Sequence, residues 1–373
     1  MKKVKGGITA PKGFQAAGIA AGIKRSGNSD MALIYSDVPA TAAGVFTTNQ
    51  VKAAPIIVSM KQLQGGAAQA IIANAGNANC WTGDKGLIDA WKMVKDTGRA
   101  LTINPRYVLV ASTGVIAHSM PMPKILAGIK QLPWKLSKKG GKEAARAILT
   151  TDLQPKEIAV KVGKITIGGI AKGSGMIAPG MATMLGFITT DAEIGQPLLQ
   201  KMLRQAVAKT FNMVSVDNCM STNDCVFVLA NGRSGSRVKG QGARRQFSAA
   251  LEYVCEYLAK AIARDGEGAS KLMTVKASGA ASWKDARVVV KALINSFLLK
   301  AAVAGRDRNF GRILQALGTT DAQINWDKFK FTWKFGKEED VITVHLGVGK
   351  ESAAGWGCDL TEGYVKINAR YHT

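Results

Sequence analysis

Short apolar runs that stop in glycine- and asparagine-rich loops, and alternate with amphipathic stretches, constrain this chain most strongly. The run AQAIIA at 68–73 stops in NAGNANCWTG and is followed by LIDAWKMVKDTGRAL at 87–101; a second run, YVLVA at 107–111, stops in STGVIAHSMPMP. Apolar runs of this length are typical of buried strands, and apolar residues three or four apart are typical of helices. The alternation predicts a mixed α/β protein with loops at strand ends, where functional sites usually form.

The same alternation continues along the rest of the chain. We expect strands at 184–190 and 225–232, a short helix at 142–149 and longer helices at 196–211 and through 247–262. The polar, basic segment NGRSGSRVKGQGARRQ at 231–246 is the best candidate for a linker, because glycine and serine punctuate it.

Charge and composition narrow the class of protein. Fifty Lys and Arg residues against 26 Asp and Glu give a net charge of +24, which favours acidic partners such as nucleic acid or small anions. The basic residues are scattered and dense only at 135–146, and no helix-turn-helix, zinc-finger or RNA-recognition signature accompanies them. We therefore favour a solvated basic surface over a specific nucleic-acid site.

Location and metal chemistry follow from what the sequence lacks. It has no secretory signal and no apolar run long enough to span a membrane. Its five cysteines form no Cys-x-x-Cys pair, and no His/Asp/Glu cluster has metal-ligand spacing. These features predict a cytoplasmic protein without disulfides, metal or cofactor.

The usual catalytic bases are missing from the sequence. It has three histidines (His118, His345 and His372), no Gly-x-Ser-x-Gly elbow, no P-loop and no Gly-x-Gly-x-x-Gly opening a helix. Thr183 follows a Pro-Gly turn at the start of an apolar strand. It is either a packing residue or, after cleavage of the Ala182–Thr183 bond, a nucleophile whose own α-amine is the general base.

The segment AKGSGMIAPGMATMLGFITTDA at 171–192 closely resembles the self-cleavage segment of the bifunctional ornithine acetyltransferase/N-acetylglutamate synthase family of arginine biosynthesis. The resemblance extends along the chain through GGITAPKGFQAAGIAAGIK, AGVFTTNQVKAAP, NAGNANCWTG, ASTGVI, TTD, SVDNCMSTNDCVFVLANG, RDGEGASK, DRNFGRIL and YVKINARYHT. The chain departs from the family at 117–119, where Ala-His-Ser replaces a glycine and apolar residues.

The resemblance implies a set of site residues. Thr183 becomes the nucleophile of a β chain, 183–373, cut from an α chain, 1–182, and the two chains associate as a heterotetramer. Thr113 and Gly114 supply the oxyanion hole, so that Gly114→Pro is expected to slow acyl transfer more than it disturbs folding. The residues implied around the substrate are Thr150 (with Thr151 as an adjacent rival), Lys172, Thr183, Glu267, Asn368 and Thr373.

The resemblance also implies a fold and an activity. The fold is a layered α/β sandwich related to the D-aminopeptidase/ornithine acetyltransferase group, with a nucleophile-bearing domain at 1–240 and a smaller α/β domain at 241–373. The activity is ping-pong transfer of acetyl from N-acetylornithine to glutamate, without a cofactor; whether acetyl-CoA is a further donor is left open. Two alternatives are a self-cleaving aminopeptidase or amidase on the same scaffold and a basic nucleic-acid-binding protein.

Overall fold

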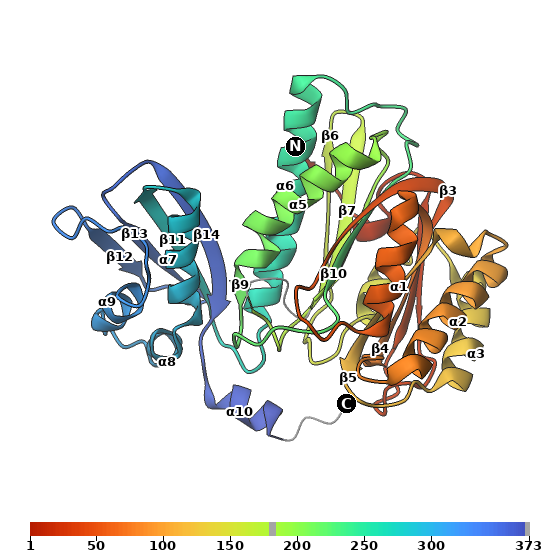
Figure 1. The fold of residues 1–373 in the computed structure, drawn as a ribbon, viewed down its shortest axis with the longest axis horizontal. Coiled ribbons are helices and arrows are strands. Elements are labelled where there is room, and N and C mark those ends of the chain that lie inside the picture. Colours follow the sequence, from red (N-terminus) through yellow and green to blue (C-terminus); the bar gives the residue numbers. More distant parts are fainter. Residues whose placement is uncertain (179–183, 370–373) are drawn as a thin grey trace.

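Two β-sheets organise the fold in the computed structural model, which describes residues 1–178 and 184–369 (Figure 1). The described residues form a 9-stranded sheet and a 5-stranded sheet, with helices packed on both. The mixed α/β class predicted from the sequence is therefore confirmed.

The larger sheet has the strand order β1-β6-β7-β8-β10-β3-β4-β5, with β2 paired to β3. Its strands are β1 Lys2–Lys3, β2 Phe14–Ile19, β3 Met31–Phe46, β4 Ala67–Asn77, β5 Val108–Val115, β6 Lys156–Val162, β7 Ile165–Lys172, β8 Leu185–Thr190 and β10 Cys225–Ala230. β8 is parallel to β10 and β4 to β5, whereas the other neighbours are antiparallel. β8 thus lies between β7 and β10 in the middle of the sheet.

A long, irregular strand folds the larger sheet over on itself. β3 has 16 residues, and its register against β4 shifts between Tyr35 and Ala40. One apolar cluster combines Ile34 of β3 and Leu109 of β5 with Phe187 of β8, although β5 and β8 are far apart in strand order. The two halves of the sheet therefore face each other across this cluster, as layers of a sandwich.

Helices cover the two outer faces of this sandwich (Figure 1). The helices of the larger unit are α1 Ala54–Gln62, α2 Gly83–Leu101, α3 Met122–Lys135, α4 Gly141–Ala147, α5 Gln196–Lys209 and α6 Gln241–Arg264, with 3₁₀ turns at Gly7–Thr9, Leu63–Gly65, Pro105–Tyr107 and Phe211–Met213. Of these, α4 packs on β2 and β3 and adds its buried side chains to the cluster between the two halves of the sheet. α5 and α6 bury the apolar stripes expected from their periodicity, α5 against β3 and α6, and α6 against β6 and β7. On the other face, α2 packs on β5, and α3 packs on β2 and β3.

The segment expected to be a linker is part of the larger unit instead. Residues 231–240 form a loop in which Asn231 Nδ2 donates to the Lys12 carbonyl over 2.9 Å and Arg237 pairs with Glu193. The last six residues of the segment already belong to α6, which begins at Gln241. The linker interpretation is wrong because the polar residues of this segment pair with Lys12 and Glu193, which belong to the larger unit.

The smaller sheet has the order β12-β13-β11-β14-β9 and carries the remaining helices. Its elements are β9 Val214–Ser215, β11 Leu272–Ala280, α7 Trp283–Asn295, α8 Phe297–Gly305, α9 Gly311–Leu317, β12 Lys330–Lys334, β13 Glu339–His345, β14 Glu351–Cys358 and α10 Glu362–Asn368. The expected domain boundary at 240/241 coincides with the start of α6, which packs on the larger sheet, while β9, before that boundary, pairs in the smaller one.

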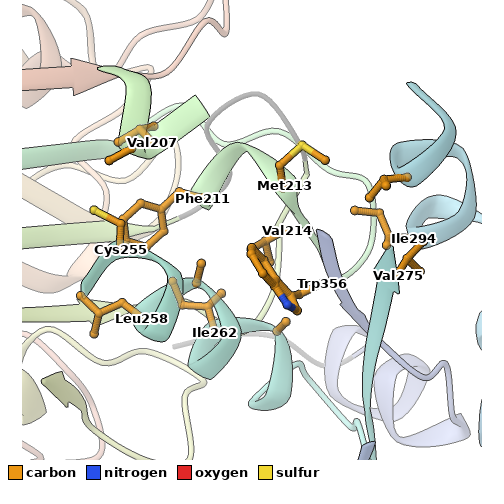
Figure 2. Close-up of a cluster of buried hydrophobic side chains, with 14 of the residues drawn as sticks. Val207, Phe211, Met213, Val214, Cys255, Leu258, Ile262, Val275, Ile294 and Trp356 are labelled. Atoms are coloured by element: carbon orange, nitrogen blue, oxygen red, sulfur yellow. The ribbon is translucent and has the colours of Figure 1, made fainter. Parts of the chain in front are cut away.

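Apolar side chains join the two units, as Figure 2 shows. Phe211 lies just before β9, and Val214 is the first residue of β9. Ile262 comes from α6, and Trp356 of β14 lies beside these side chains. This contact holds the smaller unit against α6. The segment after β14, which contains α10, can therefore reach the larger unit. Among the described residues, no single helix is long and apolar enough to cross a membrane; only α7 and α8 together, bent by 58°, meet that requirement of length and composition.

Candidate active site

The ends of β5 and β7 meet in the described structure. Thr113 and Gly114 lie near the end of β5, and Lys172 is the last residue of β7. Lys172 Nζ lies 3.4 Å from Thr113 Oγ1, and each residue is 2% exposed. Because β5 and β7 are not neighbours in strand order, this contact depends on the folding-over of the larger sheet.

Gly114 occupies a position that only glycine fits. Its φ is +132°, and a Cβ built on it would lie 2.3 Å from the carbonyl carbon of Gly76 on β4. Proline requires φ near −65°. The expectation that Gly114→Pro would slow transfer more than it disturbs folding is therefore wrong, because the substitution would break the β4–β5 contact.

The two rival threonines, Thr150 and Thr151, follow α4 and make different contacts. Thr150 Oγ1 accepts a hydrogen bond from Lys172 Nζ over 2.8 Å, whereas Thr151 Oγ1 lies 2.7 Å from Ser174 Oγ. Both side chains line the same pocket. The hydroxyl of Thr150 is the one that is held by Lys172.

A buried network of charged side chains lies behind Lys172. Asp152 Oδ2 is 3.8 Å from Lys172 Nζ, and Asp152 Oδ1 accepts from Lys156 Nζ over 2.7 Å. Lys156 also donates to Asp265 over 2.5 Å, and Asp152 accepts from the backbone N–H of Gly173 over 2.6 Å. The side chains of Asp152, Lys156 and Lys172 are at most 3% exposed. Such a network is costly to leave half-paired, so it fixes the lysine in place.

Burial and pairing shift the pKa values of Asp152 and Lys172 in this network. Burial alone would raise the pKa of Asp152, but Lys156, Lys172 and the hydrogen bonds hold it well below its ordinary value. Burial lowers the pKa of Lys172, and the attraction of Asp152 opposes that effect. Asp152 is thus the group that most strongly opposes the lowering of the pKa of Lys172.

A glutamate and an asparagine from the second half of the chain complete the described site. Asn368, at the end of α10, donates through Nδ2 to Glu267 Oε2 over 2.8 Å. Glu267 is 8% exposed, and its backbone N–H donates to the Ser174 carbonyl over 2.8 Å. Thr361, before α10, donates to the Gly268 carbonyl over 2.6 Å and so ties α10 to the Glu267 loop.

One pocket collects all of the predicted site residues that the structure describes. It is lined by Thr113, Gly114, Ile116, Thr150, Thr151, Lys172, Gly175, Met176, Ser221, Thr222, Asn223, Glu267 and Asn368. Asn223, which the sequence reasoning did not single out, donates to the carbonyls of Ala78 and Ser112 over 2.6 and 2.9 Å. The only signal for it was its place in the motif SVDNCMSTND.

Ala182, Thr183 and Thr373 lie outside the described residues, but aspartates hold both flanks of the segment that contains Ala182 and Thr183. Before it, Asp217 accepts from the backbone N–H of Met176 and Ile177 over 2.6 and 2.8 Å. After it, Asp224 Oδ1 accepts from the backbone N–H of Met184 over 2.9 Å.

The two histidines that the structure describes do not line the pocket. His118 lies in an exposed loop, and His345 is on β13 near Ser278, while His372 is outside the described range. In residues 1–178 and 184–369, no three His, Cys, Asp or Glu side chains come together as a metal site would require.

Comparison with known proteins places the sequence in a family. The sequence profile of the ArgJ family matches residues 15–337 and 334–373. The chain is 46% identical to the arginine biosynthesis bifunctional protein ArgJ of Symbiobacterium thermophilum, and the match covers both chains completely. The chain belongs to the ArgJ family. It is equally similar, at 46% over both whole chains, to the ArgJ protein of Listeria monocytogenes serotype 4b.

The family resemblance predicted from the sequence motifs is thus confirmed, and this ArgJ-family chain is an acyltransferase of arginine biosynthesis. Among solved structures, ornithine acetyltransferase of Mycobacterium tuberculosis in complex with ornithine is 42% identical, with a TM-score of 0.47; the match covers 49% of this chain and 98% of that one. The ArgJ protein of Bacillus halodurans is also 42% identical, with a TM-score of 0.45, over 49% of this chain and 96% of that one.

Proposed function

We propose that the chain cuts itself between Ala182 and Thr183 and then transfers acetyl from N-acetylornithine to glutamate through an acetyl ester on Thr183. The observation that carries this proposal is the convergence of Thr113, Gly114 and Lys172 in one pocket with Glu267 and Asn368. These residues come from widely separated parts of the sequence, and that pocket is lined by β5, the end of β7 and α10.

The charges of the pocket suit an amino-acid substrate. N-acetylornithine and glutamate both carry an α-carboxylate, which Lys172 can bind as a buried cation. Glu267 can accept hydrogen bonds from a substrate amine, and Asn368 already holds one of its oxygens. One pocket with a cation and an anion therefore serves both substrates in turn, as a ping-pong reaction requires.

The chemical steps need a nucleophile, a base and a group that stabilises an oxyanion. The hydroxyl of Thr183 attacks the acetyl carbonyl, and its proton passes to the α-amine of Thr183. The backbone N–H of Gly114 and the hydroxyl of Thr113 stabilise the negative oxygen that develops. The amide C–N bond then breaks, the proton moves to the leaving ornithine amine, and the amine of glutamate attacks the ester to release N-acetylglutamate.

Strand pairing supports continued association of the two fragments. β8, from 183–373, pairs with β7, from 1–182, and β10 pairs with β3 in the same way. Cleavage would therefore leave each fragment held in the larger sheet by the other. We extend the proposal to a heterotetramer of two α and two β chains.

The test measures cleavage and transfer together. Intact mass should give fragments 1–182 and 183–373 for the wild type and an uncut chain for Thr183→Ala. Purified wild type given N-acetylornithine and glutamate should release ornithine and form N-acetylglutamate in equal amounts. A parallel reaction with labelled acetyl-CoA and glutamate decides whether acetyl-CoA is a donor.

Other results would contradict the proposal. An active but uncut wild type would exclude an N-terminal threonine as the nucleophile. Release of acetate without transfer to glutamate would indicate an amidase on the same scaffold. Retention of nucleic acid at physiological salt without any acyl transfer would favour the nucleic-acid-binding alternative.

A further inference from the structure

The helix α10 brings Asn368 to the pocket, although none of its own residues is fully buried. Its first turn lies directly on the Glu267 loop, where a Cβ on Gly268 would come within 2.3 Å of the backbone nitrogen of Tyr364. Most helices in proteins are held in place by an apolar face packed on a core. Because no residue of α10 is fully buried, polar contacts must fix its position and that of Asn368.

One of these polar contacts joins α10 to the segment that follows β9. Tyr364 Oη donates to Asp217 Oδ2 over 3.2 Å. Asp217 lies two residues after β9 and is 6% exposed. Burial and the nearby charge of Asp217 raise the pKa of the Tyr364 hydroxyl, so it keeps its proton and remains a donor.

The same carboxylate also holds a wall of the pocket. Asp217 Oδ2 accepts from the backbone N–H of Met176 over 2.6 Å, and Oδ1 accepts from those of Ile177 and Cys219 over 2.8 and 3.1 Å. Met176 lines the pocket, and its φ of +56° is one that residues other than glycine rarely adopt. A single buried carboxylate thus ties a pocket residue in an unusual conformation to the helix that carries Asn368.

Tyr364 and Asn368 are four residues apart in α10 and therefore lie on the same face of the helix. Asn368 Nδ2 donates to Glu267 Oε2 over 2.8 Å and to the Tyr364 carbonyl over 3.0 Å. An amide nitrogen of this kind has two hydrogens, and these two contacts use both of them. The place of Tyr364 therefore decides where the Asn368 amide meets Glu267.

We propose that Tyr364 is a positioning residue for substrate binding: its hydrogen bond to Asp217 holds α10 beside the pocket, and through Asn368 it fixes the carboxylate of Glu267. The inference rests on the proposed function, in which Glu267 accepts hydrogen bonds from a substrate amine. Tyr364 itself is not among the residues that line the pocket. Loss of its hydroxyl should therefore weaken the binding of both substrates and leave the chemical step nearly unchanged.

The experiment removes this hydroxyl alone, in Tyr364→Phe, and uses Tyr257→Phe as the matched control. Tyr257 lies on α6, is 39% exposed, and has the ammonium group of Lys3 5.0 Å from its ring. Steady-state kcat and KM are measured with N-acetylornithine and glutamate. The affinity for ornithine is measured by calorimetry, which needs no turnover, and hydrogen exchange of the α10 amides and the thermal midpoint are measured on the same proteins.

Tyr364→Phe should raise KM for both substrates, and weaken ornithine binding, by about five- to tenfold, the size of one hydrogen bond, while kcat stays within about twofold. The amides of α10 should exchange faster. The thermal midpoint should stay near that of the wild type, because α10 has no fully buried residue. Tyr257→Phe should leave all of these values near those of the wild type.

A double-mutant cycle separates positioning from a general loosening of the fold. If Tyr364 acts through Asn368, adding Tyr364→Phe to Asn368→Ala should change the ornithine affinity by less than about twofold. Full additivity of the two substitutions would overturn the assignment. Unchanged ornithine affinity in Tyr364→Phe, or an equal loss in Tyr257→Phe, would overturn it as well.

The proposed function and the role of Tyr364 fail in different ways. A wild type that binds ornithine but transfers no acetyl group refutes the proposed function alone, because ornithine affinity and the cycle still decide the role of Tyr364. A wild type that transfers acetyl, with a Tyr364→Phe variant that keeps its KM values and affinity, refutes the role of Tyr364 alone. A wild type that neither transfers acetyl nor binds ornithine overturns both.

Discussion

Replacing Asp152 with asparagine is expected to destabilise the protein and discharge Lys172 at the same time. At an effective dielectric constant of 20, a carboxylate attracts a cation 2.7 Å away by about 6 kcal/mol and one 3.8 Å away by about 4 kcal/mol; these are the distances from Asp152 to Lys156 and Lys172. Desolvation offsets much of this, so we expect a net loss of about 3–5 kcal/mol in the free energy of unfolding.

The functional part of this prediction follows from burial. Without Asp152, burial lowers the pKa of Lys172 further, because its main opposing charge is gone. A neutral lysine binds a carboxylate weakly, so KM for both N-acetylornithine and glutamate should rise. Asp96→Asn is the control, since Asp96 also pairs with two cations, Lys92 and Arg99, but on an exposed helix face; it should cost at most about 1 kcal/mol.

The pH dependence gives an independent check. The pKa of Asp152 is lower in the folded protein than in the unfolded chain, so its contribution is complete above about pH 4 and is lost as the pH falls below that value. The difference in unfolding free energy between wild type and Asp152→Asn, from urea titrations, should be largest at pH 7 and shrink near pH 3.5. A difference below 1 kcal/mol at pH 7, or one independent of pH, would refute the reasoning.

Three further substitutions test separate parts of the site. Lys172→Met should raise KM for both substrates at least thirtyfold, from a loss of about 2–5 kcal/mol, while neutralising the exposed pair Lys138 and Lys139 should change steady-state KM little; equal effects would mean that Lys172 is misassigned. Gly114→Ala should lower both the urea midpoint and the transfer rate, because its Cβ collides with β4; a stable, active variant would contradict this. Ala117→Gly should raise the unfolding free energy by about 0.5–1 kcal/mol in urea titrations, since Ala117 has φ +63°; destabilisation would show that its methyl group packs.

The secondary structure could be predicted from the sequence where a single period dominates a segment. The apolar stripe from Phe247 to Ile262 predicted the helix α6, and the run AQAIIA predicted the strand β4. The polar segment before α6 misled the linker prediction, because glycine and serine mark loops whether or not a loop is fastened to the domain. The two-residue β9 carries too few residues for any period to be visible.

The site residues could be predicted from motifs, but the charge pairs that support them could not. Asp152 is the last residue of the TTD motif, but its pairing with Lys156, and that lysine's contact with Asp265 more than a hundred residues later, depend on the tertiary fold. Asp224 was visible only as one more polar residue in SVDNCMSTND. Whether an aspartate is buried, and which donors its oxygens reach, is decided by packing rather than by spacing.

The interleaving of strands from both sides of residue 183 has a consequence for folding kinetics. Before cleavage, β7, β8, β10 and β3 belong to one molecule, and the larger sheet forms in a unimolecular reaction. After the proposed cleavage, the same sheet would reform only when two chains meet, so refolding would become second order and the apparent midpoint of unfolding would depend on protein concentration. The lifetime of a cut protein would then be set by its rate of unfolding rather than by its equilibrium stability. The proposed cleavage would thus turn a reversible fold into one that is assembled once.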